Sequence, residues 1–296
     1  MIIVRLIGGH SNQLFQYAAG RSMAEKHRTQ LLLDTTWFKE AAEIDSPREY
    51  ELGVYPLAAK TTKLKGLSVI DTRQPVGRKT TLLRRLHLGN DIWMHYEHGL
   101  GYNDDFFGLP DNTLLNGYWQ NQRYFLGVRD HLLKELEPKT KPSTKNQKLI
   151  DRMKKTESVW MHIRRGDYVT SKIYNKYHGL KDIAYYKKGL ETLIKKLPAE
   201  RRKHIEIFVC SNDIPWCKKN MKFDFPVHFV ENELGSDDMR VVKHCKHDVL
   251  ANSSFSWWGA WLNDNPDKIV VAPKQWFNDK QANSEIEIVP PEWIRV

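Results

Sequence analysis

Two adjacent arginines, a glycine and an aspartate follow an apolar segment in the middle of this 296-residue chain. Residues 158–163 are β-prone and predict a buried strand that ends at Arg164-Arg165-Gly166-Asp167. In α/β folds, ligands bind at the carboxyl edge of the sheet. Guanidinium groups suit phosphate because their donors form a rigid fork and keep their charge. The turn therefore indicates a diphosphate site, with a solvated basic corner as the alternative.

Polar residues also follow two other segments that have the composition of strands. Residues 205–209 lead into Ser211 and Asp213, and residues 248–251 lead into Asn252-Ser253. Helical patterns separate these segments, and strands that alternate with helices predict a parallel sheet. All three polar sets would then share one edge of one sheet, which favours a ligand site over a solvated corner.

The segment that begins at Asn252 could contribute to such a site. Ser253 and Ser254 come where a strand gives way to a helix, so their hydroxyl and N–H groups could hold a phosphate. A plain helix cap is the alternative. Trp257 and Trp261 fall on one helical face, and this spacing predicts that both side chains pack in the core.

The amino-terminal residues have the order of a doubly wound nucleotide-binding unit. A strand at residues 2–6, the turn Gly8-Gly9 and a helical stretch precede a second strand at residues 31–33. With only two fingerprint glycines, the turn does not predict a dinucleotide site. It can still bring backbone N–H groups close to an anion.

Residues 137–145 are charged, poor in apolar side chains and contain two prolines, which is typical of a linker. We therefore expect two domains, at residues 1–140 and 150–296, joined by a linker at about 137–150. Residues 40–150 show the weakest periodicity, so the elements of the first domain are harder to predict.

Composition limits the classes of partner. The formal charge of +10 is spread over both halves of the chain, which argues against a nucleic-acid-binding tail. No apolar run is long enough to span a membrane, and the start does not resemble a signal peptide. We expect a cytoplasmic protein, with peripheral contact at the cytoplasmic face of the inner membrane as an option. Three sparse cysteines fit a reducing compartment, and the histidines around Cys245 lack the spacing of a zinc site.

Three motifs, in the right order, resemble those of the bacterial inverting α-1,2-fucosyltransferases. They are His162-Ile163-Arg164-Arg165-Gly166-Asp167-Tyr168, the segment 252–262 and Asn12-Gln13-Leu14-Phe15-Gln16-Tyr17-Ala18, and Ala272-Pro273-Lys274 fits too. The resemblance implies a GT-B-like α/β fold with two Rossmann-like domains facing a central cleft. It also implies GDP-β-L-fucose as co-substrate, a terminal β-galactoside as acceptor, inversion to an α-1,2 linkage, and neither metal nor cofactor.

The chain contains no Asp-x-Asp pair, so arginine must offset the charge on departing GDP. We assign Arg164 to the pyrophosphate, with Arg165 either assisting it or supporting the loop. The resemblance implies further GDP-sugar contacts: His162 and Asp213 near the guanosine, Ser253, Ser254 and Phe255 around the phosphates together with Asn252, and Asn12 and Gln13 over the sugar.

The general base has two candidates. Asp167 is suitably placed, although pairing with Arg165 is as good an explanation, and His10 lies in the glycine turn. The leaving phosphate could also accept the proton. The family pattern is Gly-Gly-Leu-Gly-Asn-Gln, and this chain has His10 and Ser11 instead. Serine reaches positive φ less easily than glycine, so we expect a reshaped turn that leaves donor and acceptor preference open.

Two other functions stay in play beside a galactoside α-1,2-fucosyltransferase. One is a related transferase that uses another nucleotide sugar, and the other is a non-catalytic carbohydrate- or RNA-binding module. The sequence predicts neither the exact acceptor glycan nor the oligomeric state.

Overall fold

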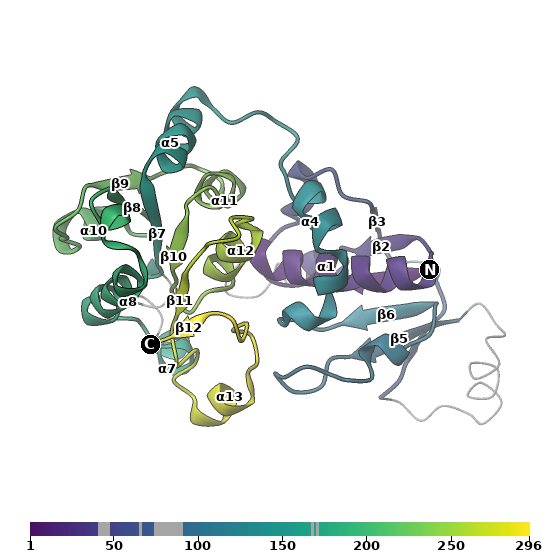
Figure 1. The fold of residues 1–296 in the computed structure, drawn as a ribbon. Helices are drawn as coiled ribbons and strands as arrows, with labels where there is room; N and C mark the ends of the chain where they lie inside the picture. The colour runs from purple at the N-terminus through teal and green to yellow at the C-terminus, as the bar shows by residue number, and fades with distance from the viewer. Residues whose placement is uncertain (41–47, 65–66, 74–90, 167–168, 170–171) are drawn as a thin grey trace. The chain divides into compact units, whose positions relative to one another are not determined.

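The computed structural model describes residues 1–40, 48–64, 67–73, 91–166, 169 and 172–296 (Figure 1). The chain divides into two compact units, Met1–Lys139 and Thr140–Val296. Helix α5 (Thr144–Lys155) begins close to the division, where the Ser143 hydroxyl accepts a hydrogen bond from the Asn146 N–H at 3.2 Å. Part of the segment that we expected to be a linker is therefore helical.

The described residues of the first unit form a six-stranded sheet in which every paired strand is parallel. Its order is β3-β2-β1-β6-β5-β4. The first three strands run from β1 at the centre to β3 at one edge, and the next three run from β4 at the other edge back to β6 beside β1. The strands are β1 (Ile2–Arg5), β2 (Leu31–Asp34), β3 (Lys60–Thr62), β4 (Val69–Asp71), β5 (Ile92–Tyr96) and β6 (Thr113–Asn116).

Helix α1 (His10–His27) follows β1 and is buried on most sides. Its apolar residues recur at helical spacing, and Leu14, Phe15 and Ala18 among them are fully buried. Apolar residues all round are expected of a helix inside a core, as opposed to one at a surface. The other described helices of this unit are α2 (Trp37–Glu40), α4 (Arg129–Glu135) and the 3-10 turns η2 (Leu52–Val54), η3 (Phe106–Gly108), η4 (Gln122–Tyr124) and η5 (Leu126–Val128).

The second unit contains another parallel sheet, of order β12-β11-β10-β7-β8-β9. Taken from the other side, β7 is the first strand of the Rossmann order 3-2-1-4-5-6. The predicted α/β fold with two Rossmann-like units, as in GT-B proteins, is confirmed. The strands are β7 (Glu157–Ile163), β8 (Ile205–Ser211), β9 (Val227–Val230), β10 (His247–Val249), β11 (Val270–Ala272) and β12 (Ile294–Arg295).

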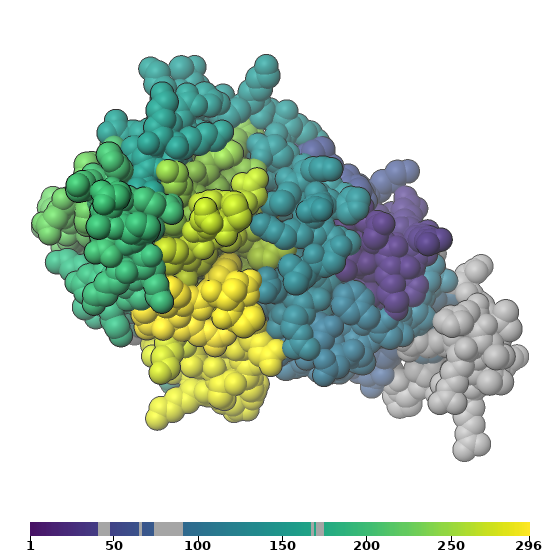
Figure 2. Space-filling view, in the orientation of Figure 1, coloured from purple at the N-terminus to yellow at the C-terminus, as the bar shows by residue number. Residues whose placement is uncertain are grey.

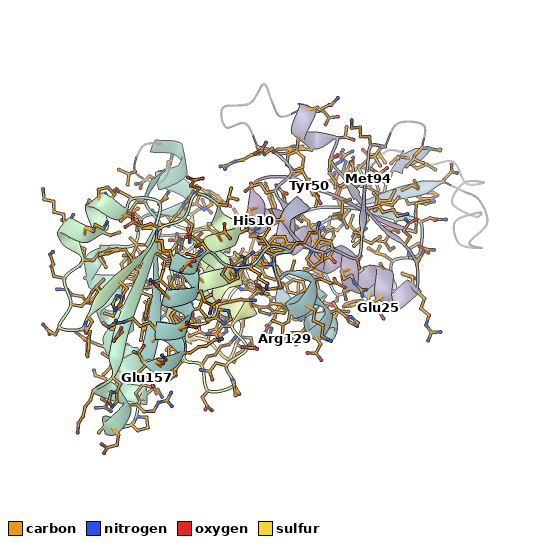
Figure 3. All side chains as sticks on the ribbon, turned by 90° about the horizontal axis from the view of Figure 1, so that it is seen from above. His10, Glu25, Tyr50, Met94, Arg129 and Glu157 are labelled. Carbon is orange, nitrogen blue, oxygen red and sulfur yellow. The ribbon has the colours of Figure 1, made fainter. Side chains whose placement is uncertain are left out.

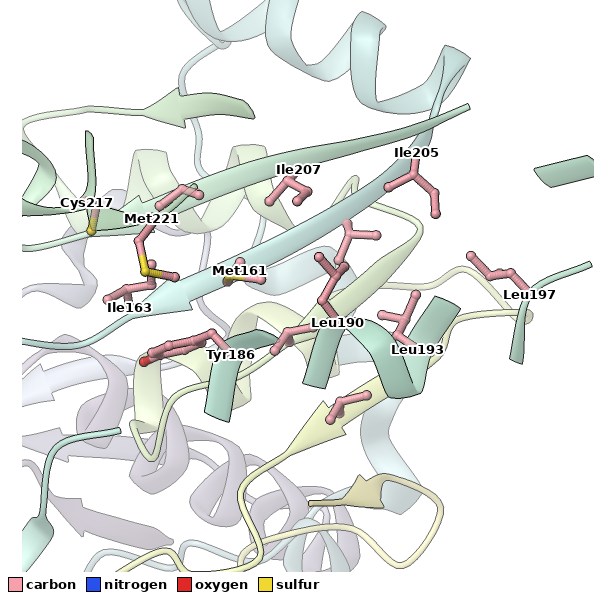
Figure 4. Packing of buried hydrophobic residues seen from close by; sticks show 14 residues of the cluster. Met161, Ile163, Tyr186, Leu190, Leu193, Leu197, Ile205, Ile207, Cys217 and Met221 are labelled. Atoms are coloured by element: carbon pink, nitrogen blue, oxygen red, sulfur yellow. The ribbon is translucent and has the colours of Figure 1, made fainter. Parts of the chain in front are cut away.

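The helices of the second unit cover both faces of its sheet (Figure 1). Alternate residues of β7 point to opposite faces, and Val159, Met161 and Ile163 pack against Leu190 and its neighbours on α8 (Figure 4). The helices are α5, α7 (Lys172–His178), α8 (Ile183–Lys196), α9 (Ala199–Arg202), α10 (Ile214–Asn220), α11 (Gly235–Val242), α12 (Ser254–Leu262) and α13 (Lys280–Glu285).

Helix α12 packs on the opposite face of β7 from α8. A Cβ built at Gly259 would lie 2.3 Å from the Trp160 ring, so only glycine permits this approach of helix to strand. Trp257 and Trp261 stack with ring centroids 5.9 Å apart and are buried, which confirms their predicted packing role. The first turn of α12 is thereby held at the end of β7.

The carboxyl-terminal segment completes the second unit. This segment is the part of the chain after α12. It supplies β11 and β12, and β11 lies beside α8. The segment is yellow in Figure 2. Among the helices formed by the described residues, none combines the length and the apolar character needed to cross a bilayer.

Candidate active site

The carboxyl ends of β7 and β10 lie side by side in the second sheet, because these strands pair directly. The chain continues from β7 to β8 on one side and places β10 on the other, so the strand order reverses here. Arg164 follows β7, and Ser253, the N-cap of α12, follows β10. The structure therefore brings Arg164 and Ser253 together at a switch point, the usual ligand-binding position of such sheets.

Arg165 is held by three contacts with the turn after β8 and with α10 (Ile214–Asn220). Its Nε donates to Asp213 Oδ2 at 3.0 Å, and its guanidinium lies 3.7 Å from the centroid of the Trp216 ring. Its backbone N–H donates to Asn212 Oδ1 at 2.9 Å. Of the two roles left open by the sequence, these contacts favour support of the loop.

Asp213 is engaged on both oxygens. Oδ2 pairs with Arg165, and Oδ1 accepts a hydrogen bond from the Trp216 N–H at 3.2 Å, which caps α10. The described partner of Arg165 is therefore Asp213, whereas the sequence suggested Asp167. Asp167 and Tyr168 lie outside the described residues. Contact of Asp213 with guanosine stays a prediction.

Gly166 gives the arginine turn its shape. Its φ is +27°, a region that L-residues disfavour. A Cβ at this position would lie 1.9 Å from Asn212 Nδ2. Only glycine fits here, and the turn after β7 is thereby packed against the turn after β8.

Arg164 is partly buried, and its charge acts on two histidines. Burial, together with the charge of Arg164 as the smaller cause, lowers the pKa of His162 to about 3. Burial and Arg164 also lower the pKa of His178, the last residue of α7. Both imidazoles are therefore neutral near pH 7, and neither adds positive charge beside Arg164. Sequence reasoning missed His178, because only the fold brings α7 to this edge.

His162 supports the first turn of α12. Its Nδ1 lies 2.5 Å from Ser256 Oγ, and its ring centroid lies 5.0 Å from that of Phe255. The residue is only 4% exposed. This burial favours a role in positioning Phe255 over direct contact with guanosine.

The N-terminus of α12 has no side-chain cap among the described residues, since the Ser253 hydroxyl makes no capping bond. By contrast, Asp182, Asp213 and Asp279 each cap a helix of the same unit through a carboxylate oxygen. The first-turn N–H groups of α12, which include those of Ser254 and Phe255, are therefore placed to bind an anion. This observation supports the predicted phosphate contacts.

Asn252 is buried and organises the loops around the site. Its Nδ2 donates to the carbonyl oxygens of His178, Gly179 and Trp276 at 2.7, 3.1 and 3.0 Å. The side chain is 1% exposed. These contacts indicate a positioning role for Asn252, whereas we expected direct contact with the donor.

In the first unit, the glycine turn after β1 differs from our expectation. Gly8 has φ +74°, and Gly9 is the N-cap of α1 with extended backbone. His10 and Ser11 already belong to α1, whose right-handed helical backbone suits any L-residue. The expectation that Ser11 would reshape the turn was therefore wrong, because position 11 does not need positive φ.

His10 is a poor candidate for the general base. Its ring is packed on Tyr55, and Nε2 lies 2.8 Å from the Tyr55 hydroxyl oxygen. Burial lowers its pKa to about 4, so the imidazole binds a proton weakly. These observations argue against His10 as the residue that deprotonates an acceptor.

We expected both Gln13 and Asn12 to contact the sugar, but the two side chains have different surroundings. Gln13 is fully buried and joins the glycine turn to residues 49–51 through hydrogen bonds. Asn12 is partly buried, and its Oδ1 accepts from Gln120 Nε2 at 2.9 Å. Gln13 therefore shapes the edge of the first sheet, while contact of Asn12 with a ligand stays a prediction.

The loop after β6 lies at the same edge, because β6 pairs with β1. The Glu97 carboxylate accepts hydrogen bonds from the N–H groups of Tyr118 and Trp119, at 2.6 and 2.9 Å. Trp119 has φ +56°, and a Cβ at Gly117 would lie 2.4 Å from Glu97 Cβ. The loop is thereby held in a tight shape that leaves Tyr118 45% exposed.

Within the described part of the chain, no group of three or more His, Cys, Asp or Glu side chains has the arrangement of a metal site. Cys210, Cys217 and Cys245 are buried thiols. His247 contacts Glu157 at 2.5 Å and belongs to the core.

A doubly wound unit with an arginine and an uncapped helix N-terminus at its switch point is typical of proteins that bind nucleotide phosphates. The model of glycosyl transferase family 11 matches residues 67–296, and the chain belongs to this family. The family membership predicted from the three motifs is confirmed.

Three curated relatives illustrate the family. The chain is 31% identical over 300 residues to an alpha-1,2-colitosyltransferase of Escherichia coli, covering 100% of this chain and 99% of the relative. It is 29% identical to the O-antigen biosynthesis glycosyltransferase WbnK of the same species, covering 98% and 99%. It is 26% identical to the galactoside 2-alpha-L-fucosyltransferase Sec1 of Mus musculus, covering 71% and 56%.

Among solved structures, the chain is similar to the fucosyltransferase NodZ from Bradyrhizobium, with 12% sequence identity and a TM-score of 0.46. That match covers 88% of this chain and 92% of NodZ. A mutant of Arabidopsis thaliana FUT1 in complex with GDP matches with 12% identity and a TM-score of 0.49, covering 91% of this chain and 69% of that one.

Proposed function

We propose that this glycosyltransferase moves L-fucose from GDP-β-L-fucose to the 2-hydroxyl of a terminal β-galactoside, with inversion and without a metal. The observation that carries the proposal is the placement of Arg164 beside the N-terminus of α12 at the β7/β10 switch point. A cation and backbone N–H groups that converge on one point are suited to a diphosphate.

The chemistry follows from this placement. In an inverting displacement, the acceptor oxygen attacks C1 of the sugar while the bond from C1 to the β-phosphate oxygen breaks. Negative charge then grows on the leaving GDP, and Arg164 with the α12 N–H groups would stabilise it. Arg165, Asp213 and Asn252 hold the surrounding loops, so that these donors need little rearrangement during the reaction.

The names of the relatives support the α-1,2 linkage, and they leave fucose and colitose as the two sugars that the donor could carry. One relative is an alpha-1,2-colitosyltransferase and another a galactoside 2-alpha-L-fucosyltransferase. Both names specify transfer to a 2-position. Colitose is the 3-deoxy counterpart of L-fucose, so the two donors differ by one hydroxyl group. GDP-colitose is therefore the second candidate donor, favoured by the 31% identity to the colitosyltransferase.

The acceptor would bind at the carboxyl edge of the first sheet. The exposed ring of Tyr118 offers a flat face for the apolar side of a galactose ring, and Asn12 and Gln120 offer amide groups beside it. We propose a glycan as the acceptor and expect no nucleic-acid partner, in line with the spread of positive charge over both halves of the chain.

A donor panel tests the proposal. The protein would be incubated with a β-galactoside and, in separate reactions, with GDP-fucose, GDP-colitose, GDP-mannose or a UDP- or dTDP-sugar. Product linkage would be determined by NMR. We expect an α-1,2-fucoside from GDP-fucose. Turnover of another donor without turnover of GDP-fucose would contradict the proposed donor, and no turnover of any donor would support a binding module.

A further inference from the structure

A glutamate that sequence reasoning missed is fixed at the carboxyl edge of the first sheet. Gln13 Nε2 donates to the carbonyl oxygens of Gly8 and Glu49, at 3.0 and 2.8 Å. Gln13 Oε1 accepts from the Glu51 N–H at 3.0 Å. These three bonds, which we call the Gln13 clamp, hold Glu51 over the start of α1. Figure 3 labels His10 and Tyr50, which mark the two segments that the clamp joins.

The Glu51 carboxylate is oriented by one of its two oxygens. Oε1 accepts a hydrogen bond from the His10 backbone N–H at 2.9 Å, at the N-terminus of α1. For Oε2, no hydrogen-bond donor is found among the described residues, and the side chain is partly exposed. A Cβ built at Gly9 would lie 3.8 Å from Oε1 and 3.6 Å from Arg48 Nη1. The carboxylate and the guanidinium thus both lie close to the glycine turn.

The surroundings raise the proton affinity of this carboxylate. Burial raises the pKa of Glu51, while the His10 N–H and the charge of Arg48 lower it and the charge of Glu49 raises it again. The net direction is upward. The His10 imidazole is neutral because burial lowers its pKa to about 4, so it adds no charge. A raised pKa makes the carboxylate a better proton acceptor, which suits a general base.

Two other carboxylates at this edge already accept hydrogen bonds on both of their oxygens. Glu97 accepts hydrogen bonds on both oxygens from the N–H groups of Tyr118 and Trp119. Asp34 pairs with Arg5 Nε at 3.0 Å and accepts from the Thr36 hydroxyl at 2.6 Å. Glu51 differs from both in that one of its oxygens remains available to a ligand.

We propose that Glu51 is the general base that deprotonates the acceptor hydroxyl. The inference rests on the proposed function. The hydroxyl proton passes to Glu51 Oε2 as the acceptor oxygen forms its bond to C1 of the sugar. The bond from C1 to the β-phosphate oxygen breaks, and its electron pair leaves with GDP. The proton on Glu51 is then released to water, so the reaction balances without a co-reactant.

The test compares Glu51→Gln with the wild-type protein. Glutamine keeps an oxygen that can accept from the His10 N–H, so the turn should remain folded, as circular dichroism would verify. We expect kcat to fall by roughly 10²–10⁴, the usual contribution of a general base. The KM for the GDP-sugar should stay within about twofold. Glu40→Gln, an exposed change in the same unit, should leave kcat unchanged.

The pH profile separates a catalytic role from a structural one. In the wild-type protein, kcat should fall at low pH as the base becomes protonated, and Glu51→Gln should lack this fall. Glu51→Asp should restore part of the rate and the acidic limb together. The proposal would be overturned by Glu51→Gln with a kcat near wild type, or with a low kcat and an unchanged acidic limb. Absence of transfer by the wild-type protein would instead overturn the proposed function.

Discussion

Arg164 and Arg165 are neighbours in sequence, but their surroundings differ. Arg165 is committed to Asp213 and to the Trp216 ring, so its charge is used within the protein. Arg164 helps to lower the pKa values of His162, which is buried, and His178, which is partly buried. Cation–π and ion-pair contacts of the Arg165 kind fix a loop. We assign Arg164 to the diphosphate because it directly follows β7 at the switch point of the sheet.

Replacing Arg164 by alanine tests this assignment at the level of one residue. We expect kcat/KM to fall by a factor on the order of 10²–10³, the usual loss when one preorganised donor to a developing negative charge is removed. Arg152→Ala is a suitable control, since it removes an exposed ion pair with Glu206 in the same unit. A loss of only a few-fold, matched by the control, would favour a binding module instead.

The protonation state of His162 is a second prediction at this scale. Burial disfavours the charged imidazole and lowers its pKa to about 3, whereas an unfolded histidine titrates near 6.5. His162 therefore contributes stability that is complete above about pH 6.5 and is lost as pH falls toward 3. An NMR titration of the ring should show a neutral imidazole at pH 5. A midpoint near 6.5 would contradict the account.

At the scale of elements, the site depends on how closely α12 approaches β7. Gly259 permits this approach, because a side chain there would meet the Trp160 ring. The His162 contact to Ser256 and the Phe255 ring continue the same interface toward the strand end. The position of the α12 N–H groups therefore follows from the packing of the whole helix.

Gly259→Ala should destabilise the second unit in spite of the higher helix propensity of alanine. Overpacking of a close-packed core costs about 1–3 kcal/mol, and the free energy of unfolding from urea denaturation should fall by that amount. Gly127→Ala is the matched control, because a Cβ there meets no atom within 4 Å. Equal stability of the two variants would show that α12 can shift away from β7.

At the scale of the whole molecule, sequence patterns predicted most of the second unit. The strand before Arg164 and the buried tryptophans of α12 lie close to where the sequence pattern placed them. These elements are long or strongly apolar, so their local sequence pattern matches their burial in the fold and could be recognised without it. The α/β class and the family followed from the order of elements and from the motifs.

Other features could not be predicted because they depend on distant parts of the chain. The Gln13 clamp joins residues 38 positions apart, and the Asn252 amide reaches His178 across 74 positions. Neither contact leaves a local periodic signal. The glycine turn was misjudged because position 11, which is a glycine in the family pattern, lies inside α1, where the helical backbone suits serine.

The central claim is that arginine and helix N–H groups, and not a metal, support transfer of a GDP-linked sugar. The most direct measurement is the rate of α-1,2-fucoside formation from GDP-fucose and a β-galactoside, with and without excess chelator. The account predicts equal rates and the same product linkage. A rate that is lost with chelator and restored by Mg²⁺ or Mn²⁺ would contradict it.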